Sequence, residues 1–510
     1  MVGGQKDVRC PPGVRDALSA ATRRQYPQSK RGGLLLLFTS LEFLLTFLPG
    51  TLAVYFLLPK KARNYWLLLV SLFFYTWGAP KFAVFLVGSI VFNYGMALLI
   101  DKIPTGRLRK ALLAAAVLGN LSILFVFKYM NFVTSVLRGW FPALEGVIPQ
   151  TDFRLPIGIS FFTFQALSYV VDVYRGTVAV QKNPAYVGLY ISFFPQLIAG
   201  PIVRYTTIAE DIENRTITFD GFSRGVMRFL YGFNRKMLLA NVLAKAADAA
   251  FAASDLSVAM AWLGSICYTL QIYFDFSGYS EMAIGMGRMF GFRFLENFNY
   301  PYISKTVTEF WRRWHISLGS WFRDYVYFPL GGSRVKTKGR LVFNLAVVWL
   351  ATGIWHGANW TFLLWGCLYG LIIIAEKLLN LPKRLPAHRV AAAAYQILTM
   401  LAVVVGWVLF RADNLSAAGN YLMTMFGLNG AALTDSLAAF NFREYLVPLT
   451  AGIVCSTPLF RWLHEKAAAR GPVWENGYEL CDGLVQLLLF AVGLSCLVMN
   501  AHNPFIYFNF

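Results

Sequence analysis

The chain has 510 residues, of which 57% are hydrophobic and 14% are charged, and its formal net charge is +20. A soluble globular protein carries about 25% charged residues, so this composition indicates an integral membrane protein. The basic residues lie in short connections between apolar stretches and form no nucleic-acid-reading motif, so we expect no nucleic-acid partner. The six cysteines include no CxxC pair, and we expect no metal site and no disulfides.

Long apolar stretches follow one another along almost the whole chain. A membrane-spanning helix needs roughly 20 residues, so the longest stretch holds two spans, and we expect an all-α, polytopic protein with about 10–13 membrane helices. We find no internal repeat, and we expect one membrane domain over residues 35–510. The stretches are Leu34–Leu58, Tyr65–Trp77, Phe82–Ile100, Ala111–Leu137, Leu155–Val173, Ala185–Val203, Val226–Ala247, Leu256–Phe274, Leu341–Leu379, Ala391–Phe410, Tyr445–Leu463 and Leu484–Met499.

Four basic connections predict the orientation in the membrane. Residues 59–64, 101–110, 331–340 and 376–389 are rich in Lys and Arg and should therefore be cytoplasmic. Residues 1–34 are also basic but precede a helix whose start should lie outside. They contain three prolines and no apolar periodicity. We expect this segment to be either a disordered basic tail or the product of a start codon assigned too far upstream.

The passage "EFWRRWHISLGSWFRDYVYFPLGG", residues 309–332, places a histidine among tryptophans and arginines. If residues 308–322 are helical, His315 shares one face with Trp311 and Arg312 behind it and Leu318 ahead, at three- and four-residue spacing. The basic connection beginning at Arg334 follows closely, so we expect His315 in the cytoplasmic half of the membrane or at that interface.

A second histidine lies in "GIWHGANW", residues 353–360, near the middle of an apolar stretch between two cytoplasmic connections. We therefore expect His356 at membrane depth or toward the far side, where an ionisable group indicates function. Imidazole exchanges a proton near neutral pH, which makes His356 a candidate general base. The alternative for both histidines is a structural role, bonding a neighbouring helix. His388, His464 and His502 lie near helix ends or the C-terminus, and we expect them to be structural.

Both histidine passages, together with "FFTFQALSYVVDVYRG", "SFFPQLIAGPIVRY", "QIYFDFSGYSEMAIG" and the ending "NPFIYFNF", resemble the membrane-bound O-acyltransferases. The likeness is greatest to the bacterial AlgI-type alginate O-acetylation branch and runs from about Leu35 to Phe510. The resemblance implies a multi-pass protein of the bacterial inner membrane, with helices around a central tunnel that the two histidines line. It assigns the catalytic base to His356 and the other family position to His315.

The resemblance also implies the substrates. An acyl thioester, either acetyl-CoA or a carrier-bound acyl group, approaches from the cytoplasm, and the hydroxyl of a polysaccharide such as alginate approaches from the opposite side. No bound cofactor or metal is expected, and periplasmic acetyltransferases are the expected protein partners, besides the lipid bilayer itself. Arg312 or Arg313 would attract an anionic donor, and Asp275, Gln165 or Asn359 would orient a histidine. The remaining candidates for substrate or tunnel contacts are Trp311, Trp314 and Trp355.

Other functions fit the sequence less well. A transporter or flippase often shows inverted repeats, which are absent here. D-alanylation of teichoic acid and peptidoglycan O-acetylation are alternatives that keep acyl transfer and change the acceptor. "GFSRG", residues 221–225, lacks the strand that a nucleophile elbow requires, so we attribute it to chance. The small-xxx-small spacing in "GIWHG" and "GCLYG" favours close helix packing.

Overall fold

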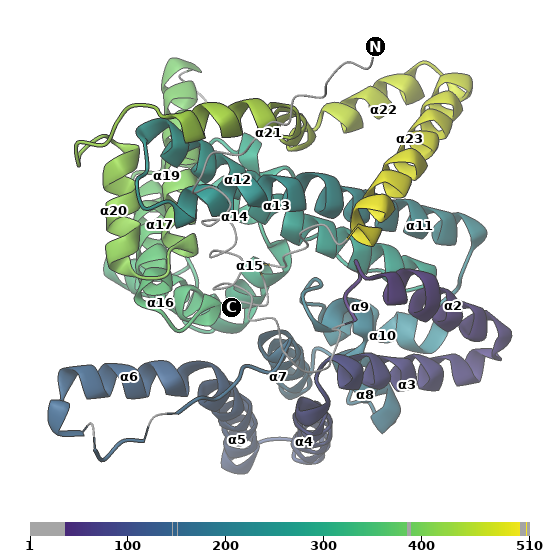
Figure 1. Cartoon of the computed structure of the whole chain (residues 1–510). Helices are drawn as coiled ribbons and strands as arrows, with labels where there is room; N and C mark the ends of the chain where they lie inside the picture. Colours follow the sequence, from purple (N-terminus) through teal and green to yellow (C-terminus); the bar gives the residue numbers. More distant parts are fainter. Residues whose placement is uncertain (1–35, 145, 150, 385–388, 500–505, 507–510) are drawn as a thin grey trace.

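The computed structural model describes residues 36–144, 146–149, 151–384, 389–499 and 506, and this part of the chain is helical without β-strands. The expected boundary at residue 34 therefore lies outside the described residues. The α-helices (Figure 1) are α2 (Leu48–Leu57), α3 (Lys60–Gly78), α4 (Ala83–Lys102), α5 (Arg107–Leu124), α6 (Met130–Trp140), α7 (Ile159–Arg175), α8 (Pro184–Ser192), α9 (Phe194–Leu197), α10 (Tyr205–Asn214), α11 (Phe219–Asn234), α12 (Asn241–Ala252), α13 (Val258–Met289), α14 (Val307–Arg313), α15 (Ile316–Phe322), α16 (Lys338–His356), α17 (Trp360–Leu378), α18 (Leu381–Arg384), α19 (Arg389–Arg411), α20 (Leu415–Met425), α21 (Ser436–Cys455), α22 (Leu459–Ala469) and α23 (Pro472–Val498).

Short π- and 3-10-helical turns interrupt or join these helices. The π turns are η1 (Phe43–Phe47), η3 (Phe125–Tyr129), η5 (Arg235–Ala240) and η7 (Arg323–Tyr327), and the 3-10 turns are η2 (Pro80–Phe82), η4 (Pro142–Leu144) and η6 (Pro301–Ile303). A π turn inside an α-helix is rare and often marks a functional region.

The all-helical membrane architecture predicted from composition is confirmed. Within the described residues, five helices are long and apolar enough to cross a membrane, or six if the pair α21–α22, bent by 54°, counts as one span. The difference from the expected 10–13 has a physical cause. Central helices such as α7 and α13 are buried over most of their length and carry buried polar side chains, among them Gln165, Asp172 and Asp275. Such polar residues lower the hydropathy of these helices. Other expected spans are divided into short helices, as where residues 185–203 form α8 and α9.

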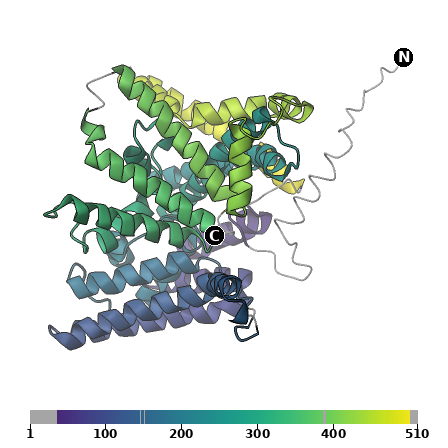
Figure 2. The same cartoon turned by 90° about the vertical axis from the view of Figure 1, so that its left-hand side faces the viewer.

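The helices form two groups that meet around α13. In Figures 1 and 2 the purple and blue helices lie on one side of the molecule and the green and yellow helices on the other. Helices α11 and α13 cross on glycines, because a Cβ at Gly232 would come within 2.4 Å of the Gly278 carbonyl oxygen, and one at Gly225 within 2.8 Å of the Gly285 oxygen. The passage "GFSRG" therefore serves helix packing at Gly225.

Helices α16 and α17 form a tight antiparallel hairpin. A Cβ at Gly353 would lie 2.6 Å from the Phe362 carbonyl oxygen, and one at Gly366 would lie 2.6 Å from the Trp349 oxygen. The packing role predicted for these small residues is confirmed. Because the hairpin is antiparallel, the start of α16 at Lys338 and the end of α17 at Leu378 lie at the same end of the molecule, which also carries two of the basic connections.

Candidate active site

His356 is the last residue of α16, and the three residues after it form the turn of the hairpin. Gly357 is extended, and a Cβ there would come within 2.2 Å of the Phe362 ring, so only glycine fits. Asn359 caps α17 by accepting a hydrogen bond from the Thr361 backbone N–H at 3.2 Å. The sequence Trp-His-Gly-Ala-Asn therefore ends α16 and leads into α17.

Aromatic rings enclose the imidazole of His356, which is 4% exposed. Its ring centroid lies 4.9 Å from that of Trp355, 4.9 Å from that of Trp365 and 5.2 Å from that of Phe410. The buried Nδ1 atom has no hydrogen-bond partner among the described residues. Apolar walls around an unbonded imidazole nitrogen leave that nitrogen available to a hydroxyl group.

His315 lies at the turn between two seven-residue helices and not inside one helix. Trp314 is extended and His315 is left-handed, with φ 46° and ψ 55°, so the continuous helix expected over residues 308–322 is wrong. Backbone contacts with Asn297 explain the break: its carbonyl oxygen accepts from the Ile316 N–H at 2.9 Å, and its side-chain oxygen accepts from the Ser317 N–H at 3.2 Å. These bonds begin α15 anew after His315.

Asn297 also orients the imidazole of His315. Its amide nitrogen donates to Ser280 Oγ at 3.0 Å, so its side-chain oxygen faces His315 Nδ1 at 3.1 Å. Since that oxygen accepts, Nδ1 carries the proton and Nε2 carries the lone pair. Nε2 is buried and has no hydrogen-bond partner within the described part of the chain. The imidazole is thus held in one tautomer with its basic nitrogen unbonded.

Trp355 connects the two histidines. Its ring centroid lies 6.2 Å from that of His315 and 4.9 Å from that of His356. Phe276 packs edge-on against His315 at 4.6 Å. The structure therefore brings together both predicted histidines and the predicted Trp355 in one buried aromatic site.

Glu376 fixes the entrance of the α14–α15 hairpin. This fully buried carboxylate accepts from the backbone N–H groups of Val307 at 2.7 Å and Thr308 at 2.8 Å, and from the Tyr395 hydroxyl at 3.0 Å. Glu376 lies at the end of α17, beside the basic connections. The hairpin therefore enters from that end of the molecule, turns at His315 and returns toward the connection before α16.

Lys128 fixes the end of α16. Its ammonium donates to the Trp355 carbonyl at 2.5 Å and to Ser160 Oγ at 3.3 Å, and the neighbouring Tyr129 hydroxyl donates to the Ile354 carbonyl at 2.9 Å. The last carbonyls of a helix have no partner inside it. The π turn η3 presents two consecutive side chains to these carbonyls, which holds the residues just before His356 in place.

Buried polar atoms without a protein partner concentrate near the histidines. Buried polar groups in proteins are nearly always hydrogen-bonded, so such a concentration marks a site for a polar guest. Besides the two histidine nitrogens, such atoms belong to Trp355 and Trp365, whose rings pack against His356, and to Trp311, whose ring packs against Trp365.

The arginines and tryptophans of the long motif have distinct positions. Trp311 and Trp314 both pack against Trp407 inside the protein, at 6.3 and 4.8 Å between ring centroids. Arg313 pairs with Glu309 at 2.8 Å and donates to the Asn299 carbonyl. Arg312 is exposed. Arg313 thus has a structural partner, which leaves Arg312 as the more accessible cation of the predicted pair.

The three residues expected to orient a histidine have other positions. Asp275 pairs with Lys236 at 2.5 Å and accepts from the Ile506 N–H at 2.9 Å. Asn359 donates to the Asp413 carbonyl at 2.8 Å and caps α17. Gln165 is fully buried, but its amide bonds to no described residue. The contacts of Asp275 and Asn359 are to backbone groups and a lysine and not to a histidine, and the orienting role stays a prediction for all three residues.

Sequence reasoning missed Asn297, Glu376 and Lys128. A signal existed for Lys128 and Glu376, because each is an ionisable residue inside a predicted apolar stretch. No local signal identified Asn297, whose partner His315 lies 18 residues away across a loop and a helix.

Comparison with known proteins identifies the family of this chain. Residues 118–415 match the family model described as MBOAT, membrane-bound O-acyltransferase family. The chain is 39% identical over 505 residues to the probable alginate O-acetylase AlgI of Azotobacter vinelandii and 38% identical over 529 residues to that of Pseudomonas aeruginosa. Each match covers 93% of this chain and 100% of the relative. The peptidoglycan O-acetyltransferase of Helicobacter pylori is 36% identical over 522 residues, covering 93% of this chain and 98% of the relative.

The chain therefore belongs to the membrane-bound O-acyltransferase family and is a multi-pass membrane O-acyltransferase.

Proposed function

We propose that this protein transfers an acetyl group from a cytoplasmic thioester to hydroxyl groups of an extracytoplasmic polysaccharide, in the inner membrane of a bacterium. The observation that carries this proposal is the pair of buried histidines that both pack against Trp355, in a chain similar over nearly its full length to alginate O-acetylases. Alginate is the acceptor that these relatives' names favour.

The reaction needs one base and a path for each substrate. The acceptor hydroxyl gives its proton to His356 as its oxygen attacks the thioester carbonyl. The tetrahedral intermediate then collapses, the carbon–sulfur bond breaks, and the thiolate leaves and recovers the proton as a thiol. The products are an ester and a free thiol. General-base assistance of this kind contributes typically 10²–10⁴-fold in rate.

The placement of the two histidines supports approach of the substrates from opposite sides. Helix α16 runs from the basic connection at Lys338 to His356, which is about 28 Å at 1.5 Å per residue. This length approaches the thickness of the hydrocarbon core, about 30 Å. The α14–α15 hairpin carries His315 inward from the basic end. If that end is cytoplasmic, His315 faces the donor and His356 faces the acceptor.

Under this proposal the enzyme needs no bound cofactor, because the acetyl donor, either acetyl-CoA or a carrier-bound acetyl group, is consumed as a substrate. Periplasmic acetyltransferases are the proposed partners that complete delivery to the polymer.

Peptidoglycan is the second candidate acceptor, because the Helicobacter pylori relative named for that activity is almost as similar as the alginate O-acetylases. D-alanyl transfer and a transport role lack comparable support.

One experiment separates these acceptors. Ester-linked acetate is measured by NMR in exopolysaccharide and in purified sacculi from cells with and without the gene. The proposal expects loss of acetate from the exopolysaccharide alone. Loss confined to the sacculi would assign peptidoglycan, and unchanged acetate in both fractions would contradict acetyl transfer to either polymer.

A further inference from the structure

A large apolar groove opens on the side of the molecule next to the His356 turn. Its volume is about 1060 Å³. One wall is formed by α5, η3 and the start of α6, and the other by α7, the end of α15, η7, α16 and the start of α17. Trp355, Gly357 and Asn359 form part of its lining, so the groove reaches the segment on both sides of His356.

The groove faces the bilayer. The segment Arg107–Trp140, which supplies one wall, is long and apolar enough to span the membrane and is mostly unburied. Leu118 on this wall and Ile354 on the opposite wall are 64% and 47% exposed. Leu118 lies on a segment able to span the membrane, and the wall opposite it also exposes an apolar side chain, so we infer that the groove opens toward lipid and not toward water.

The chemistry of the lining favours hydrocarbon over the pantetheine arm of a thioester donor. Such an arm carries amide groups that lose free energy when buried without partners. Three polar side chains of the lining are engaged: the Tyr129 hydroxyl bonds the Ile354 carbonyl, the Tyr325 hydroxyl bonds Asp172, and the Asn359 amide bonds the Asp413 carbonyl. The indole N–H of Trp355 has no partner among the described residues, and it offers one donor to an arm that carries several amide groups. An acyl chain requires no such partners and fills an apolar space of this size.

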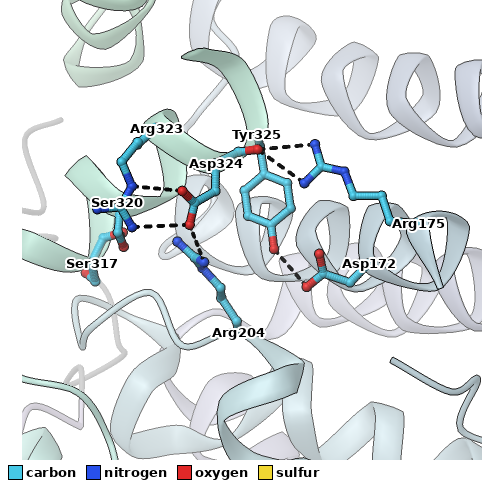
Figure 3. A network of polar contacts seen from close by, with 8 residues as sticks. All are labelled: Asp172, Arg175, Arg204, Ser317, Ser320, Arg323, Asp324 and Tyr325. Atoms are coloured by element: carbon cyan, nitrogen blue, oxygen red, sulfur yellow. Dashed lines mark hydrogen bonds and ion pairs between the residues drawn. The ribbon is translucent and has the colours of Figure 1, made fainter. Parts of the chain in front are cut away.

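One end of the groove carries cations. Tyr325 lines the groove, and the guanidinium carbons of Arg175 and Arg204 lie 5.2 and 5.4 Å from its ring centroid. Figure 3 shows that Asp324 is engaged by Arg204 and Arg323, whereas Arg175 donates only to the Asp324 backbone carbonyl, at 3.2 Å.

A second cation lies near the same end of α7. Arg109 stacks on Tyr174 at 5.1 Å and donates to the Pro104 carbonyl. Within the described residues, neither Arg109 nor Arg175 forms an ion pair with a carboxylate. Arg175 is exposed and follows the groove residue Val171 by one helical turn. Asp172 interacts with Arg175 electrostatically without forming an ion pair. Two cations without a close carboxylate partner therefore stand at the end that the positive-inside rule places in the cytoplasm.

We propose that this groove binds an anionic phospholipid of the bilayer, with its acyl chains against the Trp355–Asn359 segment and its phosphate on Arg109 and Arg175. Basic pockets between membrane helices on the cytoplasmic side are suited to anionic headgroups. The lipid completes the outer wall of the protein beside His356. The proposal concerns lipid binding and does not depend on which substrates the enzyme uses.

The test is photo-crosslinking of the full-length protein in phosphatidylcholine vesicles that contain phosphatidylglycerol with a diazirine in one acyl chain. Labelled peptides are mapped by mass spectrometry. We expect labelling of residues 117–133 and 351–363 above that of the lipid-facing residues of α23.

Leu121→Trp, which fills the groove, should abolish labelling of 351–363, and Ala351→Phe provides the same test from the opposite wall. Leu488→Trp on α23 is the matched control, since Leu488 is 67% exposed to lipid elsewhere.

The headgroup assignment is tested by repeating the crosslinking with phosphatidylcholine that carries the diazirine. The ratio of groove labelling by phosphatidylglycerol to that by phosphatidylcholine measures the headgroup preference. Arg175→Gln should lower the preference for phosphatidylglycerol roughly fivefold, whereas Arg224→Gln, at an exposed arginine of α11 paired with Asp220, should leave it unchanged. Equal labelling by the two lipids in the wild type would overturn the headgroup assignment. Wild-type labelling in both groove-filling variants, or protection of the groove by a pantetheine thioester, would overturn the lipid site.

Discussion

The Nδ1 atom of His315 donates a hydrogen bond to the side-chain oxygen of Asn297, 3.1 Å away, and this single contact sets both the tautomer and the direction of the imidazole. The same oxygen accepts from the backbone N–H and the hydroxyl of Ser317. One amide therefore couples the chemistry of His315 to the break between α14 and α15.

Asn297→Leu should lower acyl transfer by roughly tenfold to a hundredfold, because His315 loses its fixed tautomer while His356 keeps its own surroundings. Asn297→Asp preserves the acceptor oxygen and should recover most of the activity. The measurement is acetate incorporation by membranes that contain equal amounts of each variant. Equal loss in the Leu and Asp variants would show that Asn297 supports the fold without orienting His315.

Lys128→Met should destabilise the protein by about 1–3 kcal/mol and lower acyl transfer, because the Trp355 carbonyl loses its partner in an apolar setting. Thermal unfolding in detergent and acetate incorporation measure the two effects. Lys81→Met is the matched control, since Lys81 is exposed at the start of a membrane-spanning segment. A Lys128→Met protein with unchanged stability and activity would mean that the lysine does not hold the end of α16.

Glu376→Gln should lower the unfolding free energy by about 1–3 kcal/mol, because the neutral amide is a weaker acceptor for the two N–H groups that begin α14. The same substitution at exposed Glu444 should have little effect. Comparing the thermal unfolding of the two variants tests this prediction. Similar melting behaviour in both would contradict an anchoring role for Glu376.

The orientation is testable with single cysteines in a cysteine-free background. Cysteines at Lys336 and Lys383 should react with a membrane-impermeant thiol reagent only from the cytoplasm, and a cysteine at Pro80 only from outside. All three positions are exposed in the structure. Labelling of the Lys336 position from outside would invert the proposed donor and acceptor faces.

Local sequence predicted the parts of this molecule that depend on composition and on rare motifs. The helical membrane class followed from the scarcity of charged residues. The two histidine motifs indicated where the candidate active site lies in an otherwise apolar protein. The contacts that organise the site were not predictable in the same way. Asn297 reaches His315 across 18 residues, and Lys128 reaches the Trp355 carbonyl across 227 residues. Spacing within one helix carries no information about such partners.

The helical interpretation of residues 308–322 failed for a related reason. Periodicity correctly indicated helical turns on each side of His315, but tertiary hydrogen bonds from Asn297 replaced the bonds that would have continued the helix. Buried α13 shows the converse effect, since its polar residues face protein and hide its membrane location from a hydropathy measure.

The central claim is that His356 is the base for acyl transfer. The most direct measurement is acetate incorporation into exopolysaccharide by cells expressing His356→Ala at the wild-type level in the membrane, with His464→Ala as the control at a half-buried histidine on α22. We predict a fall of roughly 10²–10⁴-fold for His356→Ala and wild-type incorporation for His464→Ala. Full incorporation by a correctly inserted His356→Ala protein would contradict the assignment.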